Sequence, residues 1–256
     1  LDEDHEIEID EASYKTVEDY FVALSPDGFL KRISQKTYQK SNTEDDTPKL
    51  LVPTNSEKRL QIFTSHGSMY TLPCTDFPDC KPKDKGKPLS ALMAGTDAGE
   101  QIVAMFSIDD FSNGDLVFAT KNGLIKRSKL SDYDTRSKKI AASGLADDDR
   151  IISVSLVTEK PDWLVITDKG MAVRFPSNDV SCMGRSAKGV KSISLEECDI
   201  VVMASPIDEK DDVMIFTELG YTKRSKVTQF EAKHRGGKGV RSVTLQKNGA
   251  TGTRVA

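Results

Sequence analysis

The chain has 256 residues, of which 37% are hydrophobic and 30% charged, and its formal net charge is −4. This composition is typical of a soluble globular protein, and no stretch approaches the roughly 20 consecutive apolar residues of a membrane-spanning helix. The acidic first segment, LDEDHEIEID, lacks the basic flank and apolar run of a secretory signal peptide.

Negative charge is concentrated at the start of the chain. Residues 1–19 contain nine acidic residues and one lysine, which leaves 35 Lys and Arg against 31 Asp and Glu in the rest. We therefore expect an acidic leader over residues 1–18 ahead of a mildly basic domain over residues 19–256. The leader is either a disordered linker toward preceding domains or a segment that folds against a basic surface and weakens ligand binding.

A repeat organises the remainder of the chain. Five segments resemble one another, at residues 21–32, 60–72, 116–127, 163–175 and 212–224. Their shared glycines are Gly28, Gly67, Gly123, Gly170 and Gly220. Each glycine follows a Ser or Thr by three residues and an apolar residue by four, and another apolar residue stands ten residues after it. Agreement at three positions indicates an internal repeat.

The repeated positions have physical reasons. A short apolar run rich in β-branched and aromatic residues predicts a buried strand. The hydroxyl residue can bond the backbone of a turn, and glycine supplies the positive φ that a tight hairpin requires. The single tryptophan, Trp163, begins such a strand and is expected in the core.

Further apolar strands follow each hairpin and its polar loop. They are expected over residues 101–108, 150–157, 189–195 with 199–205, and 239–245. Units of 40–50 residues with four strands each predict an all-β, propeller-like ring of about five to six four-stranded blades, with a linear β array as the alternative. Residues 128–133 and 225–230 are expected to form at most one helical turn, and the last blade to be incomplete or closed by another segment.

The four cysteines do not form a metal-binding pattern. Cys74, Cys80, Cys182 and Cys198 include no C-x-x-C pair, and the three histidines lie far from them in sequence. Because metal ligation needs clustered thiolates or imidazoles, we expect reduced thiols and no metal site.

The strand–S/T-x-x-G–apolar-x-K-R pattern and the loops GRSAKGV (184–190) and RGGKGV (235–240) resemble the C-terminal domains of the A subunits of DNA gyrase and topoisomerase IV. The resemblance extends from about Asp19 onward. It implies a β-pinwheel, a propeller variant whose blades exchange strands, with duplex DNA bent around a basic outer edge. It also implies a cytoplasmic, chromosome-associated bacterial protein. The implied partners are breakage-reunion domains of the same chain and an ATPase B subunit in a heterotetramer. The parent enzyme would use ATP and Mg²⁺, and no cofactor is expected in this domain.

One motif separates the two relatives. Gyrase usually carries the box QRRGGKG in the loop of its first blade. Here the first loop reads SQKTYQKSNTEDDTPK (34–49), whereas the related KHRGGKG stands at 233–239 in the fifth repeat. This departure favours the topoisomerase IV type of subunit.

Candidate DNA-binding residues are the bases that follow the hairpin glycines and the bases in three loops, because Lys and Arg bind phosphates and glycines let backbone amides approach them. They are Lys31, Arg32, Lys126, Arg127, Arg136, Lys138, Lys139, Arg174, Arg185, Lys188, Lys223, Arg224, Lys233, His234, Arg235, Lys238 and Arg241. A post-turn arginine has an alternative role, which is to pair with an acid on a neighbouring strand. The lysine run KPKDKGK (81–87) is expected to be solubilising.

No catalytic pattern is present in the sequence: a P-loop, GxSxG and HExxH are all missing, and no tyrosine has the context of a strand-cleaving nucleophile. The domain is therefore expected to be a non-catalytic part of an ATP-dependent topoisomerase. A propeller-like protein-interaction module that does not bind DNA is the main alternative. A ring-shaped enzyme would need converging His, Asp or Glu residues, which the sequence does not indicate.

Overall fold

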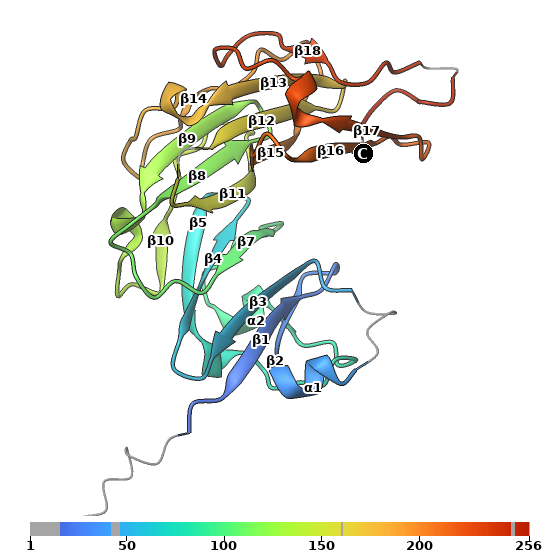
Figure 1. The fold of residues 1–256 in the computed structure, drawn as a ribbon. Helices are drawn as coiled ribbons and strands as arrows, with labels where there is room; N and C mark the ends of the chain where they lie inside the picture. Colours follow the sequence, from blue (N-terminus) through green and yellow to red (C-terminus); the bar gives the residue numbers. More distant parts are fainter. Residues whose placement is uncertain (1–15, 42–46, 160, 247–248, 256) are drawn as a thin grey trace, which may run out of the picture. The chain divides into compact units, whose positions relative to one another are not determined.

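The computed structural model describes residues 16–41, 47–159, 161–246 and 249–255 (Figure 1). The acidic leader predicted over 1–18 therefore lies almost wholly outside the described residues. The chain divides into two compact units, residues 1–59 with 73–92 and residues 60–72 with 93–256. Both consist mainly of antiparallel strands, as predicted, and the described part of the first unit also contains two short helices, α1 (Gln35–Gln39) and α2 (Leu89–Leu92). Within the described ranges, neither helix has the length and apolarity needed to cross a bilayer.

The first unit contains one four-stranded sheet. Its strands are β1 (Asp19–Leu24), β2 (Phe29–Ser34), β3 (Leu50–Asn55) and β6 (Lys87–Pro88), in the order β3-β1-β2-β6. The hairpin β1–β2 comes from the first repeat, whereas β6 follows the hairpin of the second. The sheet is thus completed by a strand from later in the sequence.

The second unit contains the other four sheets, numbered two to five along the chain. Sheet two comprises β4 (Arg59–Thr64), β5 (Ser68–Pro73), β7 (Ile102–Phe106) and β10 (Lys139–Ala141), and its terminal residues Arg59 and Pro73 belong to the first unit. Sheet three comprises β8 (Asp115–Thr120), β9 (Leu124–Lys129), β11 (Ile151–Val157) and β14 (Val190–Lys191). Sheet four comprises β12 (Asp162–Thr167), β13 (Met171–Pro176), β15 (Val201–Ile207) and β18 (Val240–Arg241). Sheet five comprises β16 (Asp212–Phe216) and β17 (Thr222–Lys226).

Strand exchange links the successive repeats. In each four-stranded sheet the outer strand beside the hairpin is a short one, β6, β10, β14 or β18, that the following repeat donates. In the first four sheets, the four strands per blade and their exchange are therefore as predicted. The strands expected over 189–195 and 239–245 are wrong in extent, because only Val190–Lys191 and Val240–Arg241 are paired. The expected single helical turns are 3₁₀ turns at Leu130–Tyr133 and Val227–Gln229.

The hairpins have the predicted turn chemistry. All five repeat glycines have φ between 74° and 85°, and each donates its N–H to the carbonyl oxygen of the hydroxyl residue three positions earlier. In the first four hairpins the hydroxyl oxygen also accepts a bond from the backbone N–H after the glycine, as Thr120 does from Leu124 at 3.1 Å. Short-range sequence chemistry thus fixes the turn in each repeat.

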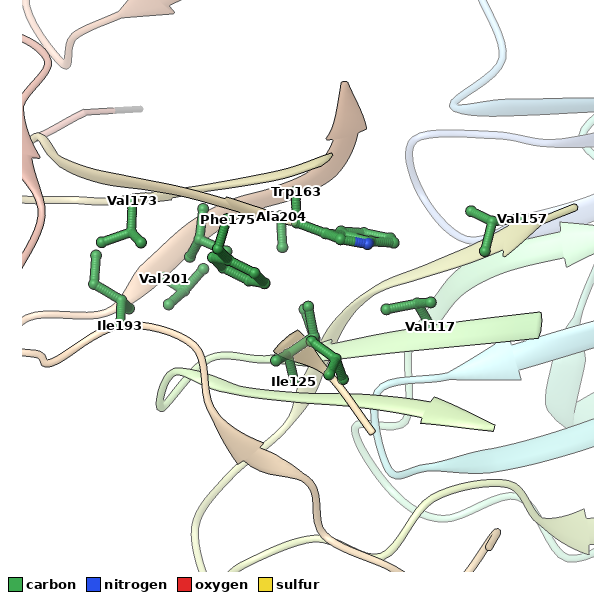
Figure 2. Packing of buried hydrophobic residues seen from close by; sticks show 12 residues of the cluster. Val117, Ile125, Val157, Trp163, Val173, Phe175, Ile193, Val201 and Ala204 are labelled. Atoms are coloured by element: carbon green, nitrogen blue, oxygen red, sulfur yellow. The ribbon is translucent and has the colours of Figure 1, made fainter. Parts of the chain in front are cut away.

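Trp163 lies in the core between sheets three and four, as predicted (Figure 2). Its side chain is 1% exposed and is surrounded by a cluster that includes Val117, Val157 and Phe175. The indole N–H donates a hydrogen bond to Ser177 Oγ at 2.9 Å, so the polar edge of the ring is satisfied in the interior. The cluster joins neighbouring sheets within the second unit.

Sheet five exposes side chains that the preceding sheet buries. Met214 and Phe216 on β16 are 55% and 50% exposed, whereas Leu164 and Ile166, at the same distances before the hairpin glycine, are 0% and 3% exposed. Sheet five has two strands and one isolated bridge, between Thr217 and Val255, within the described chain. Within the described residues, sheet five therefore has fewer paired strands than the four sheets before it.

Candidate nucleic-acid interface

The post-turn lysines point inward and bind backbone carbonyl groups. Lys31, Lys126 and Lys223 each stand three residues after a hairpin glycine. Lys31 Nζ donates to the carbonyl oxygens of Pro82 and Asp84, in a side chain only 5% exposed. Lys223 Nζ donates to Ser242 O at 2.6 Å. Lys31 thus ties the first hairpin to the loop that donates β6 to the same sheet, whereas Lys223 ties the fifth hairpin to the residue after β18, which belongs to sheet four.

Lys126 is the most buried member of this group. Its side chain is 1% exposed, and its ammonium group donates to Ala142 O at 2.9 Å and to Arg185 O at 2.7 Å. The nitrogen also lies 4.7 Å from the centre of the Phe118 ring. Burial, followed by the nearby charge of Arg185, lowers the pKa of Lys126 to about 8. This geometry leaves little of the ammonium group available to a ligand.

The post-turn arginines form ion pairs with acids. Arg127 pairs with Asp115 at 3.7 Å, Arg174 with Asp162 at 2.8 Å, and Arg224 with Asp212. These three acids occupy equivalent places at the start of the adjacent strand. In three repeats the post-turn arginine therefore has the alternative role, which is to pair with an acid on a neighbouring strand.

Arg32 differs from the other three in its partners. It pairs with Asp79 at 3.7 Å and lies over the ring of Tyr20, 4.9 Å from its centroid. The side chains of Arg32, Arg127 and Arg174 are only 10–17% exposed, whereas that of Arg224 is 71% exposed. Arg224 thus has the most accessible guanidinium group of the four post-turn arginines.

The loop KHRGGKG combines one structural arginine with accessible bases. Arg235 donates from Nε to Asp179 O at 2.8 Å and from Nη1 to Lys191 O at 2.9 Å. The guanidinium group therefore fixes the loop against the segment that precedes β15. Lys238 is exposed and has no ion pair or hydrogen bond to any described residue.

A surface hollow lies beside this loop. It has a volume of about 190 Å³, and Lys233, His234, Lys238 and the backbone of Gly237 and Gly239 contribute to its lining. Lys233 pairs with Glu231 at 3.6 Å, and His234 Nδ1 lies 3.1 Å from Asp179 Oδ2 with its side chain 97% exposed. Cationic side chains around glycine backbone form a suitable surface for a phosphate group.

The remaining candidate bases lie on or beside sheets two, three and four. Arg136 and Lys138 are exposed, Lys188 is exposed, Arg185 is half-buried and Arg241 is exposed on β18. Lys139 donates to Gly95 O and lies 5.1 Å from the ring centre of Tyr70. The hydrogen bond with Tyr70 is the main cause that raises the pKa of Lys139. Lys139 is therefore partly engaged in internal contacts, unlike Lys138 and Lys188.

Comparison with known proteins gives these positions a context. A family model described as "DNA gyrase C-terminal domain, beta-propeller" matches residues 61–109, 114–158, 161–208 and 211–251. The chain belongs to the family of DNA gyrase C-terminal domains.

Individual relatives of this gyrase C-terminal domain family member agree with the assignment. The A subunit of DNA topoisomerase 4 from Bacillus subtilis is 33% identical over 186 residues, which cover 69% of this chain and 23% of the relative. The A subunit of DNA gyrase from Chlamydia muridarum is 31% identical over 209 residues, which cover 73% of this chain and 25% of the relative. The chain thus spans about a quarter of the length of these topoisomerase subunits.

A solved structure described as the C-terminal domain of DNA topoisomerase IV has the same fold. It is 29% identical, with a TM-score of 0.83, over 94% of this chain and 76% of the solved chain. The β-pinwheel predicted for this family member is thereby confirmed.

A cluster of His66, Asp97 and Glu100 in this gyrase-family chain was not singled out by its sequence. Their ligand-type atoms lie within 4.8 Å of one another. Glu100 already accepts hydrogen bonds from Thr64, Tyr70 and the Asp97 N–H, while Lys139 lies 4.0 Å from Asp97. These contacts account for the cluster as a brace between β4, β5 and residues 95–100. Because His66 is distant in sequence from Asp97 and Glu100, only their contact in the fold reveals the cluster.

Proposed function

We propose that residues 19–256 form a non-catalytic domain that binds and bends duplex DNA through its sugar–phosphate backbone. The observation that carries this proposal is the set of exposed bases on the donated loops, above all Lys238 and Lys188, that lie beside glycine backbone and form no ion pair with any residue that the structure describes. Such residues contact phosphates without regard to base sequence. Residues 1–18 are proposed to form an acidic leader to this domain.

The bound DNA is proposed to be the segment guided into ATP-dependent strand passage by the parent enzyme. In this proposal the partners are breakage-reunion domains of the same chain and an ATPase B subunit. ATP and Mg²⁺ act in those parts and no cofactor acts in this domain. The location is the bacterial cytoplasm, on the chromosome. The names of the two relatives, which are subunits of gyrase and topoisomerase IV, support this context.

A topoisomerase IV type of subunit is favoured over gyrase in this proposal. Its support is the position of KHRGGKG at residues 233–239 and its absence from residues 34–49. Binding the chain to nicked circular DNA, ligating the nick and counting the change in linking number tests the distinction. A signed shift would indicate gyrase-like chiral wrapping, whereas an unchanged linking number supports the topoisomerase IV type.

Duplex binding itself is tested by its salt dependence. Log affinity should fall linearly with log salt concentration, and replacing Lys238 and Arg241 together by alanine should reduce the slope by about 1.8, or about 0.9 for each phosphate contact that is removed. Lys210→Ala is the matched control, because Lys210 is an exposed lysine in the turn before β16. Duplex binding that is independent of salt would refute the proposal.

A protein-interaction module without DNA binding is the second candidate function. The exposed Met214 and Phe216, with Leu219 and Tyr221 nearby at 62% and 40% exposure, favour it. Under this alternative, Phe216→Ser abolishes capture of a protein partner while duplex affinity is absent in wild type and variant. Salt-dependent duplex binding that Phe216→Ser leaves intact excludes it.

A further inference from the structure

Three loops of the protein share one backbone frame. They comprise residues 79–87, 182–190 and 232–240, and we call them the Lys–Gly loops. Each begins with an isolated parallel bridge to the post-turn arginine of the preceding repeat: Asp79 with Arg32, Cys182 with Arg127, and Ala232 with Arg174. The next N–H in each loop donates to the carbonyl oxygen of that arginine, at 2.8–3.0 Å. The three loops are thus anchored identically at their start.

The far ends of the Lys–Gly loops are also equivalent. Gly86, Gly189 and Gly239 have φ of 81°, 102° and 79°, and a Cβ on any of them would lie within 3.0 Å of a backbone carbonyl oxygen. Those oxygens belong to Leu30, Ile125 and Ala172, each two residues after its hairpin glycine. Only glycine fits this approach, so the residue before it has the same place in each loop.

That preceding residue is a lysine in all three loops. Lys85, Lys188 and Lys238 are exposed, and none forms an ion pair within the described chain. Every other loop position except the glycine varies among the three. The Lys85 ammonium also lies 4.3 Å from the centre of the Phe29 ring, a contact that neither Lys188 nor Lys238 has within the described residues.

From this shared frame we propose that Lys85 contacts a DNA phosphate in the same way as Lys188 and Lys238, so that the contact recurs in every Lys–Gly loop, including the one in the first unit. This inference rests on the proposed DNA-binding function. It assigns a ligand contact to the run KPKDKGK, whose lysines the sequence alone indicates to be solubilising. The structure separates Lys85 from its neighbours, because Lys83 stands where the other loops have Ser186 and Gly236.

The decisive measurement is the salt dependence of duplex affinity for single variants of the whole chain. Lys85→Ala and Lys188→Ala should each reduce the slope of log affinity against log salt by about 0.9, as Lys238→Ala does. Lys83→Ala, at another exposed lysine of the same loop, should leave the slope unchanged. Thermal melting of each variant verifies that the fold is retained.

The outcomes separate the two proposals. If Lys238→Ala lowers the slope but Lys85→Ala behaves like Lys83→Ala, the recurring contact is refuted while DNA binding by the chain stands. If the unmodified chain has no salt-dependent affinity for duplex, the DNA-binding function itself fails.

Discussion

The Lys126 ammonium group donates a hydrogen bond to the carbonyl oxygen of Arg185 across 2.7 Å, which joins the third repeat to the Lys–Gly loop of the fourth. A cation in the interior of the second unit thus fixes the backbone of a surface loop.

Replacing Lys126 by methionine should loosen that loop. The Arg185 carbonyl oxygen loses its donor, and an unsatisfied buried polar group costs about 1–3 kcal/mol. We expect a lower free energy of unfolding and faster amide hydrogen exchange at residues 184–188. Lys210→Met, at an exposed lysine, should change neither. Unaltered exchange in Lys126→Met would show that the hydrogen bond does not hold the loop.

The low pKa of Lys126 predicts a pH dependence of stability. The folded state holds this proton less tightly than the unfolded state, because burial moves the pKa from 10.5 to about 8. Between pH 8 and 10.5 the unfolded state therefore binds more protons, and stability from this group rises with pH. At about 1.4 kcal/mol per pKa unit the gain is about 3.5 kcal/mol at most. Denaturant unfolding at pH 7 and pH 10 should show wild type gaining stability relative to Lys126→Met, and parallel curves would contradict the assignment.

Arg235 and Lys238 should behave differently when replaced by alanine. Arg235→Ala removes two hydrogen bonds to carbonyl oxygens of Asp179 and Lys191, so it should reduce stability by about 1–3 kcal/mol and weaken DNA binding through loop disorder. Lys238→Ala should leave the melting temperature unchanged and reduce only the salt slope of binding. The comparison needs melting curves and affinities for both variants. Equal melting temperatures would contradict the role of Arg235 in holding the loop through its hydrogen bonds.

Two glycines of one loop offer a matched pair. Gly189→Ala places a Cβ against the Ile125 carbonyl oxygen at a φ of 102°, and we expect it to destabilise the protein by about 2–3 kcal/mol. Gly184→Ala meets no atom within 4 Å, and its effect should stay within about 0.5 kcal/mol. Chemical denaturation measures both. Similar values for the two variants would mean that the loop adapts to a side chain at position 189.

The hairpins were predictable from sequence because their causes are local. A hydroxyl, a glycine and a short apolar run within eight residues determine each turn. The burial of Trp163 was predictable in the same way, because it begins one of these apolar runs. The fates of Lys126 and Lys238 were not predictable from local sequence. Both are lysines in basic segments. Lys126 binds the carbonyl oxygen of a residue 59 positions away, whereas Lys238 binds no carbonyl group among the described residues. Only the pairing of the donated strands in the fold reveals this difference. The importance of Lys85 was hidden for the same reason, since its loop matches the others in backbone frame and in only two residue identities.

Strand exchange also restricts how such a chain can change in length. Removing residues 124–169, which lie between Gly123 and Gly170, would excise β9, β10, β11 and β12 and so parts of three sheets, because a sheet and a repeat are offset by one strand. A deletion that leaves the other sheets whole must remove one complete sheet, including the short outer strand that the following repeat donates to it. We therefore expect duplications and deletions in proteins of this kind to begin and end in the loops near the donated strands, and not at the boundaries of the sequence repeats.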